Sequence, residues 1–462
     1  MRKKICVIGL GYVGFPLASL TAIKGYKVIG FDIEQAIIKK LSIGQSHIRD
    51  DVVEELFDKA LISGNFSVTS NESDISDCDT YIICVPTPID SNNEPDLIPL
   101  FSSLDILTKY LQDGDLVIVE STVFPGTCEE ILIPKIEQAT GKNVSNAIHI
   151  AHCPERVNPG DSFWTSENIP RVVGSNSEYG LDEAAKFYSS ILGGPIYEVS
   201  EVRSRLRPKF SKGENGDLIT KTLPLGSVIK MKTIKDAEAV KNMENTVRDI
   251  NIAFVNELAK ISDHLNVDVV DIIDGMSTKP FGKGPFFPGA GVGGHCIAVD
   301  PEWLDTASKN AGYNPEMIRI ARSMNSSMPE YLVSLLEANL EEVSISLDGA
   351  SIAVLGVAYK ANVDDSRESP FFRVKELLLA KGANLNIYDS WVKSENTVDS
   401  IQLAIHKSQA IVIVTDHSDM INFLNSFEFT SANIKVIIDG RNALDSKVIK
   451  DFGILYHGIG RK

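Results

Sequence analysis

The stretch "KKICVIGLGYVGFPLASLTAIKGYKVIGFD", residues 3–32, decides the fold of the first part of this chain. A short run of β-branched and apolar residues, "KKICVIG", predicts a strand, and "GLGYVG" predicts a tight turn. The segment "FPLASLTAIKG" then has helical spacing as far as Gly25, and "YKVIGFD" predicts a second strand. A strand, a turn, a helix and a strand in this order indicate a parallel βαβ unit.

The turn of this unit matches the pattern G-x-G-x-x-G through Gly9, Gly11 and Gly14. Such glycines permit a tight turn and let a pyrophosphate approach the helix N-terminus. Asp32 ends the second strand; it can accept hydrogen bonds from both ribose hydroxyls and would repel a 2′-phosphate, which favours NAD over NADP. The alternative is a glycine turn beside an ordinary surface aspartate. Other positions expected to line the cofactor, at this turn and at the ends of later strands, are Tyr12, Val13, Pro86, Thr87 and Thr122.

Strand-like and helical segments continue to alternate, which predicts a doubly wound, NAD-binding α/β domain over residues 1–200. The run "DAEAVKNMENTVRDINIAFVNELAKISDHL" has apolar residues at helical spacing and predicts a long helix in a central helical domain, 233–340. A second Rossmann-like domain, 341–462, begins at "SIAVLGVAYK" but keeps only Gly356 of the glycine pattern. Residues 201–232 are basic and fit neither α/β domain. They are expected to be an insertion: a solvated loop or hairpin, or a segment for oligomer contact or phosphate attraction.

Composition excludes several classes of function. The chain has 462 residues and a formal net charge of −17, which argues against nucleic acid or an anionic membrane surface as a partner. No apolar run approaches the ~20 residues that span a bilayer. The N-terminus lacks a signal-peptide cleavage site, so a cytoplasmic protein is expected. The six cysteines form no C-x-x-C pair, which disfavours a zinc site or a disulfide framework, and no metal is expected.

Three further segments carry residues suited to chemistry. "HCPERVNPG" places Glu155 at a strand end on the cofactor side, and "VKNMENTV" places Lys241 and Asn245 four apart on one helix face. The glycine-rich segment "GAGVGGHCIAVDP" presents Cys296, with Asp300 four positions later. Taken singly, each has an ordinary explanation, because helix lysines are usually solvated and lone cysteines usually pack in cores. Their combination with an NAD site favours catalysis.

At these residues the sequence resembles the UDP-glucose/GDP-mannose dehydrogenase family over essentially its whole length. The resemblance implies an NAD-dependent, two-step, four-electron oxidation of the C6 alcohol of a nucleotide sugar to a carboxylate. The motifs that carry it, in chain order, are "GLGYVG", "VPTP", "ESTV", "CPERVNPG", "AEAVKNMENT", "PGAGVGGHCIAVDP", "YKANVDDSRESP" and "DGRN".

The resemblance also implies roles for individual residues. Cys296 would capture an aldehyde as a thiohemiacetal and carry the thioester that a second oxidation forms. Lys241 would stabilise the oxyanion, assisted by Asn245 and a water. Protons and the hydrolytic water would be handled by Glu155 and Asp300, with Thr122 orienting that water.

By the same resemblance, Arg367 approaches the cofactor across a domain interface, and the central helices pair in a homodimer. The product would enter a capsule, a lipopolysaccharide O-chain or another surface glycan. The residues expected to bind the UDP-sugar are Glu155, Arg156, Val157, Lys241, Asn245, Phe287, Gly289, Gly291, Gly293, Lys360 and Arg441.

The motifs are similar to those of the branch that acts on UDP-N-acetylhexosamines. "ESTVFPG" favours UDP-N-acetylglucosamine or its C4 epimer, whereas "HCIAVDPEW" resembles the UDP-N-acetylmannosamine enzymes; UDP-glucose is a further alternative. Of these, UDP-N-acetylglucosamine is the first expectation, although an epimer is discriminated by few hydrogen bonds. Two other classes remain open: a single-step 3-hydroxyacid dehydrogenase and a non-catalytic NAD-sensing module.

Overall fold

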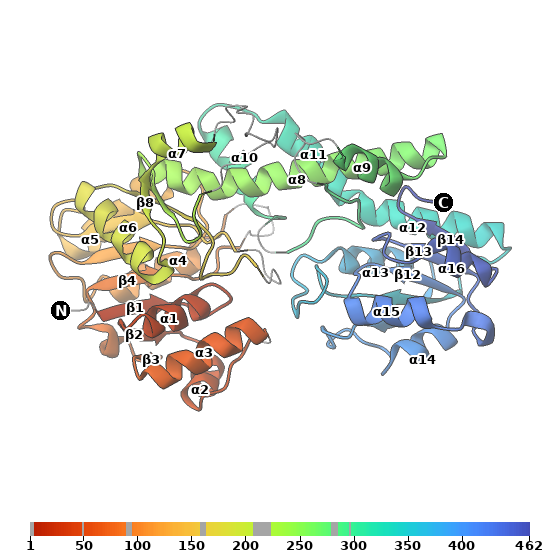
Figure 1. Ribbon diagram of the computed structural model, residues 1–462, viewed down its shortest axis with the longest axis horizontal. Helices are drawn as coiled ribbons and strands as arrows, with labels where there is room; N and C mark the ends of the chain where they lie inside the picture. Colours follow the sequence, from red (N-terminus) through yellow and green to blue (C-terminus); the bar gives the residue numbers. More distant parts are fainter. Residues whose placement is uncertain are drawn as a thin grey trace, which may run out of the picture. The chain divides into compact units, whose positions relative to one another are not determined.

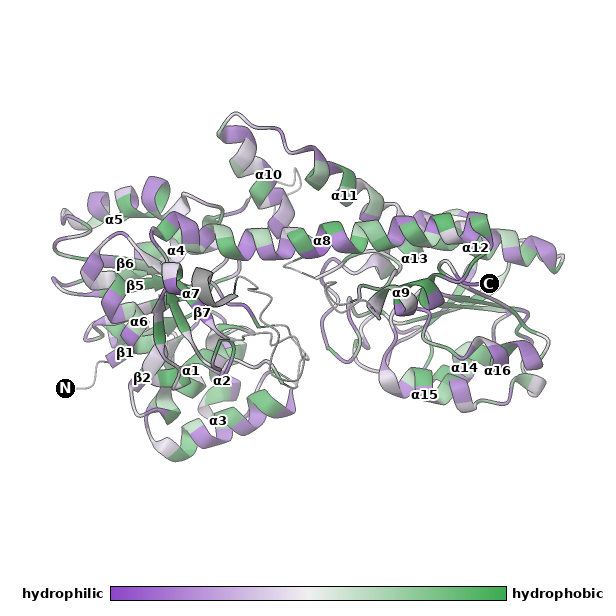
Figure 2. Cartoon of the chain, turned by 45° about the horizontal axis from the view of Figure 1, so that its top comes forward, coloured by the Kyte–Doolittle hydropathy of each residue, from purple (hydrophilic) through white to green (hydrophobic). Residues whose placement is uncertain are grey.

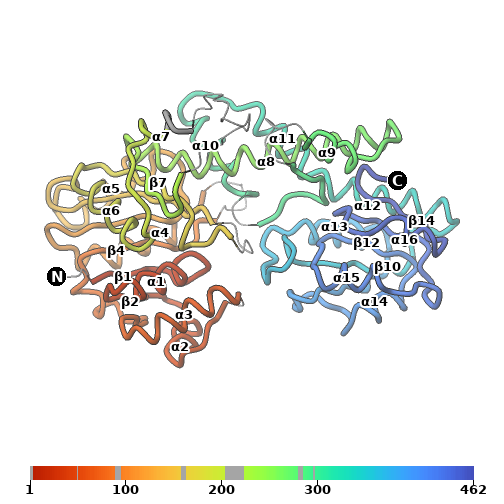
Figure 3. The backbone as a smooth tube through the Cα atoms, viewed as in Figure 1, coloured from red at the N-terminus to blue at the C-terminus, as the bar shows by residue number. Residues whose placement is uncertain are grey.

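The computed structural model describes residues 4–48, 50–88, 95–157, 163–206, 223–278, 285–294 and 297–462 (Figure 1). The chain divides into two compact units, and each is described by itself. Unit 1 comprises Met1–Glu244 and Glu302–Ala307, and unit 2 comprises Asn245–Pro301 and Ser308–Lys462. The trace in Figure 3 follows the chain through both, from the red strands of unit 1 to the blue strands of unit 2.

Unit 1 is built on a nine-stranded sheet of order β3-β2-β1-β4-β5-β6-β7-β9-β8. Its first six strands have the order of the dinucleotide-binding Rossmann fold, so the predicted α/β fold class is confirmed. The strands are β1 (Lys4–Ile8), β2 (Lys27–Phe31), β3 (Phe66–Thr69), β4 (Thr80–Ile83), β5 (Leu116–Val119), β6 (His149–His152), β7 (Arg171–Ser175), β8 (Ile196–Glu198) and β9 (Val228–Lys230).

Alternating side chains of these strands are buried on opposite faces of the sheet. In β1, Ile5 and Val7 belong to a core that also contains residues of α1, α3 and α6, whereas Cys6 is buried on the other face. Burial on both faces explains why the strands are nearly continuous apolar runs, drawn green in Figure 2. The helices of unit 1 are α1 (Gly14–Ile23), α2 (Gln35–Ser42), α3 (Asp51–Ser63), η1 (Glu72–Ile75), α4 (Ile98–Leu107), η2 (Cys128–Leu132), α5 (Ile133–Thr140), α6 (Glu178–Leu192) and α7 (Val199–Leu206).

The parallel register aligns the last residues of five strands. Phe31, Ile8, Ile83, Val119 and His152 are partners from strand to strand across β2, β1, β4, β5 and β6. The residues that follow them therefore leave the sheet along one line, which we call the carboxyl edge of unit 1. In sheets of this kind, ligands bind beyond that edge.

Two features of this sheet differ from the expectation. β7 runs antiparallel to β6, because the described part of their connection contains no helix of the kind that returns a chain for parallel pairing. The expectation that residues 201–232 fit neither α/β domain is wrong for β9, which pairs with both β7 and β8. A strand of three residues is too short to show a periodicity. The four-part domain division stays a prediction.

The predicted long helix is confirmed as α8 (Ile234–Leu265), and the boundary between the units falls within it. It is followed by α9 (Val269–Ser277), α10 (Asp300–Asn310), α11 (Glu316–Ser326) and α12 (Met328–Glu342). Among the helices of the described ranges, none combines the length and the apolar composition that crossing a bilayer requires.

Unit 2 contains a parallel five-stranded sheet of order β11-β10-β12-β13-β14. Ile352 and Val354 of β10 share a core with α12 and α13, and Ala353 and Leu355 share the opposite core with α14, α15 and α16. The strand order reverses between β10 and β12, and this switch point is where such sheets bind ligands. The elements are β10 (Ser351–Leu355), α13 (Pro370–Ala380), β11 (Asn384–Tyr388), α14 (Ile401–His406), β12 (Ala410–Ile413), α15 (Ser418–Ser426), η3 (Phe429–Ser431), β13 (Val436–Asp439), α16 (Ser446–Asp451) and β14 (Leu455–Gly458).

Asp389 ties the strand ends of this second sheet together. Its Oδ2 accepts hydrogen bonds from the amides of Val357 and Ala358 and lies 3.0 Å from Nε2 of His417, while Oδ1 accepts from the amides of residues 391–392. Burial by itself would raise the pKa of Asp389, but His417 and the amides outweigh it and lower that pKa to about 2.

We expect Asp389→Asn to lower the free energy of unfolding by about 2 kcal/mol at pH 7, because the folded pKa lies below the ordinary value of 3.8. The ionised form stabilises the fold fully above about pH 4 and progressively less as the pH falls toward 2. Urea unfolding at pH 7 and pH 3 measures the effect, with the exposed Asp399→Asn as control. An equal loss at both pH values would contradict this account.

Candidate active site

The candidate residues lie in both units, and each group is described within its own unit. Cys296 lies outside the described residues, so the structure describes its loop only up to Gly294 and from Ile297 onward.

The glycine fingerprint at the carboxyl edge has the geometry that a dinucleotide requires. Gly9 has a φ of +89°, in the left-handed region, and a Cβ on Gly14 would lie 1.9 Å from the Gly9 carbonyl oxygen. A Cβ on Gly11, in contrast, would meet no atom within 4 Å. Gly9 and Gly14 thus permit the turn and its close packing, whereas Gly11 leaves its outer side open to a ligand.

Asp32 is anchored beside this turn. Its Oδ2 accepts from the amide of Leu10 at 2.7 Å and its Oδ1 from the amide of Glu34 at 2.8 Å. Val13 precedes α1 and provides no side-chain cap, while the amide of Phe15 donates to the Gly11 carbonyl at 3.1 Å, so the start of α1 at Gly14 keeps no side chain over it. An open glycine, a helix start that no side chain caps and an anchored carboxylate are the groups that pyrophosphate and ribose need, and these residues fit NAD.

Thr87 and Thr122 follow β4 and β5 at the same edge, and both are half-buried. The two segments are linked because the hydroxyl of Ser121 donates to the carbonyl of Val85 at 2.8 Å. Pro86 is exposed beside them, as is Tyr12 in the glycine turn.

Glu155 follows β6 and is held on both carboxylate oxygens. Oε1 accepts from the amides of Arg156 and Val157 at 2.7 and 2.8 Å, and Oε2 lies 2.6 Å from Nη2 of Arg171. The side chain of Arg171 is fully buried, and its Nη1 lies 3.3 Å from Oε2 of Glu120. One guanidinium thus serves two carboxylates from neighbouring strand ends.

Lys241 is buried on α8, and residues one turn before it and one position after it fix the helix to the segment that follows Thr122. The carboxylate of Glu238 accepts from the amides of residues 126 and 128 at 2.5 and 2.7 Å, and Asn242 donates to the carbonyl of Val123 at 2.7 Å. Within the described ranges, no hydrogen bond or ion pair joins the Lys241 ammonium to another side chain. A buried ammonium that no described side chain pairs with is available to a ligand.

Arg156 connects the Glu155 segment to the same helix. Its guanidinium forms a two-point ion pair with Glu244, which lies three residues after Lys241, and donates to the carbonyl of Pro170 at 2.9 Å. The segments that carry Thr122, Glu155 and Lys241 are therefore held together within unit 1 by their neighbours.

In unit 2, Asn245 donates from Nδ2 to Oδ2 of Asp300 at 2.5 Å, and Asp300 is buried. The structure thus brings together two of the predicted residues from α8 and from the start of α10.

The glycine-rich loop packs closely against the UDP-binding candidates of unit 2. A Cβ on Gly289 would lie 2.7 Å from Nη1 of Arg441, and a Cβ on Gly293 would lie 2.6 Å from the carbonyl oxygen of Glu368. The amide of Gly294 donates to the carbonyl of Arg367 at 3.0 Å. Any side chain at these glycines would separate the loop from its neighbours. Other predicted residues of this region are Gly291, which approaches Pro370, half-exposed Phe287 and half-buried Lys360.

Arg441 follows β13 and is oriented by backbone oxygens. Its Nε donates to the carbonyl of Val414 at 3.0 Å, and its Nη2 lies 3.4 Å from the carbonyl oxygen of Tyr359. The guanidinium therefore spans the segments that follow β12 and β10. Arg367 instead pairs through two nitrogens with Asp365 of its own segment. Arg441 is therefore at the switch point of the second sheet, as a ligand-binding residue there should be.

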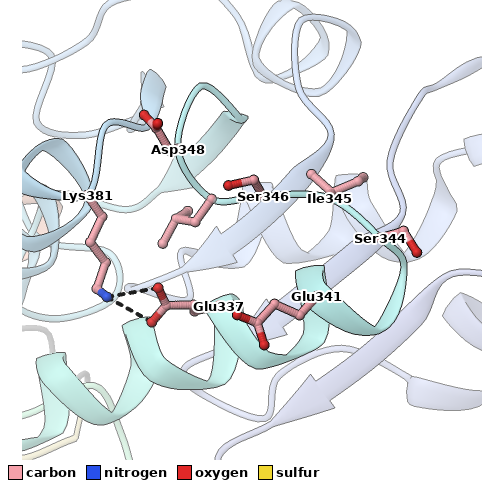
Figure 4. A pocket seen from close by; sticks show the side chains of 8 residues that line it. Glu337, Glu341, Ser344, Ile345, Ser346, Asp348 and Lys381 are labelled. Carbon is pink, nitrogen blue, oxygen red and sulfur yellow. Dashed lines mark hydrogen bonds and ion pairs between the residues drawn. The ribbon is translucent and has the colours of Figure 1, made fainter.

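A hollow elsewhere on unit 2 contains none of these residues (Figure 4). It is lined by residues of α12, by the loop before β10 and by Lys381, which follows α13 and pairs with both oxygens of Glu337. Two further carboxylates, Glu341 and Asp348, face it. Acidic groups around a neutralised lysine do not suit a phosphorylated substrate.

Sequence reasoning missed the residues that hold the candidates in place, chiefly Glu120, Arg171, Glu238, Asn242 and Glu244. One signal was available for the first two. Each is a charged residue flanked by buried apolar ones, in "VIVEST" and "PRVVGS", and a charge in such a position needs a buried partner.

The glycine fingerprint, Asp32 and the carboxyl edge define unit 1 as a dinucleotide-binding unit. Comparison with known proteins agrees with this. Sequence models of the UDP-glucose/GDP-mannose dehydrogenase family match the chain over residues 3–192 (NAD binding domain), 235–327 (central domain) and 353–446 (UDP binding domain).

Full-length relatives are also found. The UDP-N-acetyl-D-mannosamine dehydrogenase of Methanococcus aeolicus is 36% identical over 459 residues, covering 98% of this chain and 94% of that protein. The UDP-N-acetyl-D-glucosamine 6-dehydrogenase of Pseudomonas aeruginosa is 34% identical over 396 residues, covering 86% and 84%. The solved structure of the UDP-N-acetyl-D-mannosamine dehydrogenase from Pyrococcus horikoshii has a TM-score of 0.85 at 34% identity and covers 99% of both chains.

The chain belongs to the UDP-glucose/GDP-mannose dehydrogenase family. It is an NAD-dependent nucleotide-sugar dehydrogenase, and the predictions of family, enzyme class and cofactor are confirmed.

We expect Gly11→Ala to raise the Kd for NAD at least about tenfold without lowering the melting temperature, because its Cβ meets no protein atom but occupies the open side of the turn. Calorimetric titration with NAD measures this. Gly275→Ala in α9 is the matched control, since its Cβ also meets nothing within 4 Å. Wild-type affinity in the Gly11 variant would show that the pyrophosphate binds elsewhere.

Proposed function

We propose that this enzyme oxidises the C6 hydroxyl of UDP-N-acetyl-D-mannosamine to a carboxylate with two molecules of NAD⁺. The observation that carries the proposal is that Glu155 and the dinucleotide fingerprint follow strands that end at the same carboxyl edge of one sheet. A carboxylate held there is placed to serve a substrate beside the nicotinamide.

NAD⁺, held by the glycine turn and Asp32, would supply the acceptor for a hydride from C6. Lys241 stabilises the C6 oxygen as its hydroxyl proton leaves to solvent, and later the oxyanion that forms when the thiolate adds to the aldehyde, with Asn245 assisting. The Cys296 thiolate adds to the resulting aldehyde, forming an S–C6 bond, and this covalent capture prevents loss of the aldehyde between the two oxidations. The thiohemiacetal would then lose its hydroxyl proton and give a second hydride from C6 to a second NAD⁺, which leaves a thioester on Cys296.

Hydrolysis completes the reaction. A water oriented by Thr122 attacks C6, Glu155 and Asp300 manage the proton of that water, and the Cys296 thiolate leaves. One alcohol, two NAD⁺ and one water thus give one carboxylate, two NADH and three protons. Lys360 and Arg441 hold the nucleotide part through its oxygen-rich groups.

The relatives support this choice of sugar. The proteins similar over nearly all of this chain include UDP-N-acetyl-D-mannosamine dehydrogenases, two of them at 36% and 35% identity. A second candidate is UDP-N-acetyl-D-glucosamine, the first expectation from the sequence, which the Pseudomonas relative supports at 34% identity.

We expect two NADH per sugar consumed, by absorbance, with UDP-N-acetyl-D-mannosamine giving the highest kcat/KM in a panel with its glucosamine and galactosamine epimers and UDP-glucose. Cys296→Ala should abolish formation of the acid, whereas Cys78→Ala should retain it. One NADH per sugar would support a single-step dehydrogenase, and NAD binding without turnover on the panel would support a sensing module.

We also propose that the chain forms a homodimer through α8. An apolar stripe of Val247, Phe254, Ile261 and Leu265 is exposed along this helix, with exposed fractions of 45%, 54%, 45% and 67%. Its spacings of seven, seven and four residues place these side chains on one helix face, which a second copy of the same helix can cover. Large exposed apolar surfaces of this kind mark association sites.

Sedimentation should give a mass twice the chain mass of 50.5 kDa, and Phe254→Glu together with Ile261→Glu should halve it, because charge on a buried dimer face is unfavourable. Ile62→Glu on α3, where the side chain is 86% exposed, is the control. A wild-type monomer, or a dimer that survives both substitutions, would refute an α8 interface.

A further inference from the structure

A single buried cation in unit 1 is divided between two carboxylates. Arg171, the first residue of β7, lies 2.6 Å from Glu155 and 3.3 Å from Glu120. The exposed fraction is 0% for the side chains of Arg171 and Glu120 and 13% for that of Glu155. Glu155 therefore has access to the carboxyl edge, whereas Glu120 is enclosed behind it.

The enclosed carboxylate has one further partner. The hydroxyl of Tyr188 on α6 donates to Oε1 of Glu120 at 2.5 Å, and the ring of Tyr188 lies 5.6 Å from the Arg171 guanidinium. Among the residues that the structure describes, the buried thiols of Cys84 and Cys153 are further titratable groups beside this cluster. Burial raises the pKa of both thiols well above the ordinary value, so they are uncharged at neutral pH.

We propose that Arg171 is a positioning residue that fixes the carboxylate of Glu155 toward the substrate, and that Glu120 competes with Glu155 for its guanidinium. The inference rests on the proposed function, in which Glu155 manages the proton of the hydrolytic water. It assigns to three buried groups, Glu120, Arg171 and Tyr188, a part in holding that carboxylate in place.

The competition has a defined direction. Burial, and to a smaller extent the charge of Glu155, raise the pKa of Glu120 to about 7, against the opposing effects of Arg171 and Tyr188. When Glu120 is ionised, it shares Arg171 and repels Glu155; when Glu120 takes up a proton, the guanidinium is left to Glu155. A neutral group at position 120 therefore leaves the guanidinium to Glu155 at every pH.

Glu120→Gln tests this directly, since glutamine keeps the shape and can still accept from Tyr188. Because Glu120 titrates near pH 7 and glutamine does not, we expect the variant to lose the change in kcat near pH 7 that the titration of Glu120 produces in the wild type. Glu72→Gln, an exposed carboxylate paired with Lys109, is the control and should leave the profile unchanged. An unchanged profile in a folded Glu120→Gln enzyme overturns the proposal.

Removal of the Arg171 guanidinium tests the other part of the proposal, the positioning of Glu155. Arg171→Met alone would leave two buried carboxylates without a partner and could unfold the protein, so it is combined with Glu120→Gln. The double variant should fold and lose about tenfold or more in kcat, because Glu155 is no longer held. A folded double variant with wild-type kcat and profile would overturn the role of Arg171.

Glu155→Gln separates this inference from the function on which it rests. Wild-type turnover in Glu155→Gln would refute the proposed role of Glu155 and, with it, the positioning role. Loss of turnover in Glu155→Gln, together with an unmoved profile in Glu120→Gln, would leave the function standing and refute the positioning alone. A changed melting temperature with no change in any profile would show a purely structural role, which also refutes it.

Discussion

The candidate site at the carboxyl edge of unit 1 depends on one constraint, the hydrogen-bonded parallel register of β2, β1, β4, β5 and β6. It sets the last residues of five strands in one row, with neighbouring strands about 4.8 Å apart. Gly9, Asp32 and Glu120 are each the next residue after that row, and Glu155 follows three positions beyond its strand. Segments far apart in the sequence thus meet at one edge without any contact specific to the ligand.

Side-chain contacts then fix the segments that lie beyond the strand ends, whose positions the sheet does not determine. Glu238 and Asn242 fix one turn of α8 to the segment after β5, and Arg156 fixes the segment after β6 to Glu244. Because these contacts flank Lys241 on the same helix, they determine where the ammonium lies relative to the strand ends. Arg171 has the corresponding role for Glu155, and a fully buried charge of this kind is tolerated only where it is paired. Precise placement of a few groups is what catalysis requires.

Much of this could be predicted from the sequence because its signals are local. The βαβ stretch at 3–32, the long helix and the second α/β domain each have a periodicity, and the glycine fingerprint has a fixed spacing. The features that could not be predicted from the sequence depend on contacts between distant segments. Nothing near Arg171 in the sequence specifies Glu120 or Glu155 as partners, and nothing in "SVIK" specifies a strand between β7 and β8. The antiparallel turn from β6 to β7 was missed for the same reason, since strand direction is set by the connection rather than by the strand.

The central claim is that one chain completes both oxidations by holding the sugar covalently on Cys296. It is tested most directly by quenching the wild-type enzyme in acid during its first turnover with UDP-N-acetyl-D-mannosamine and NAD⁺, since acid preserves a thioester. Mass spectrometry of the peptide that contains Cys296 should reveal the acylated form before free uronic acid appears, only when both substrates are present, and its decay as the acid accumulates. Acid formation with no adduct on Cys296 at any time, or an adduct on another cysteine, would contradict the account.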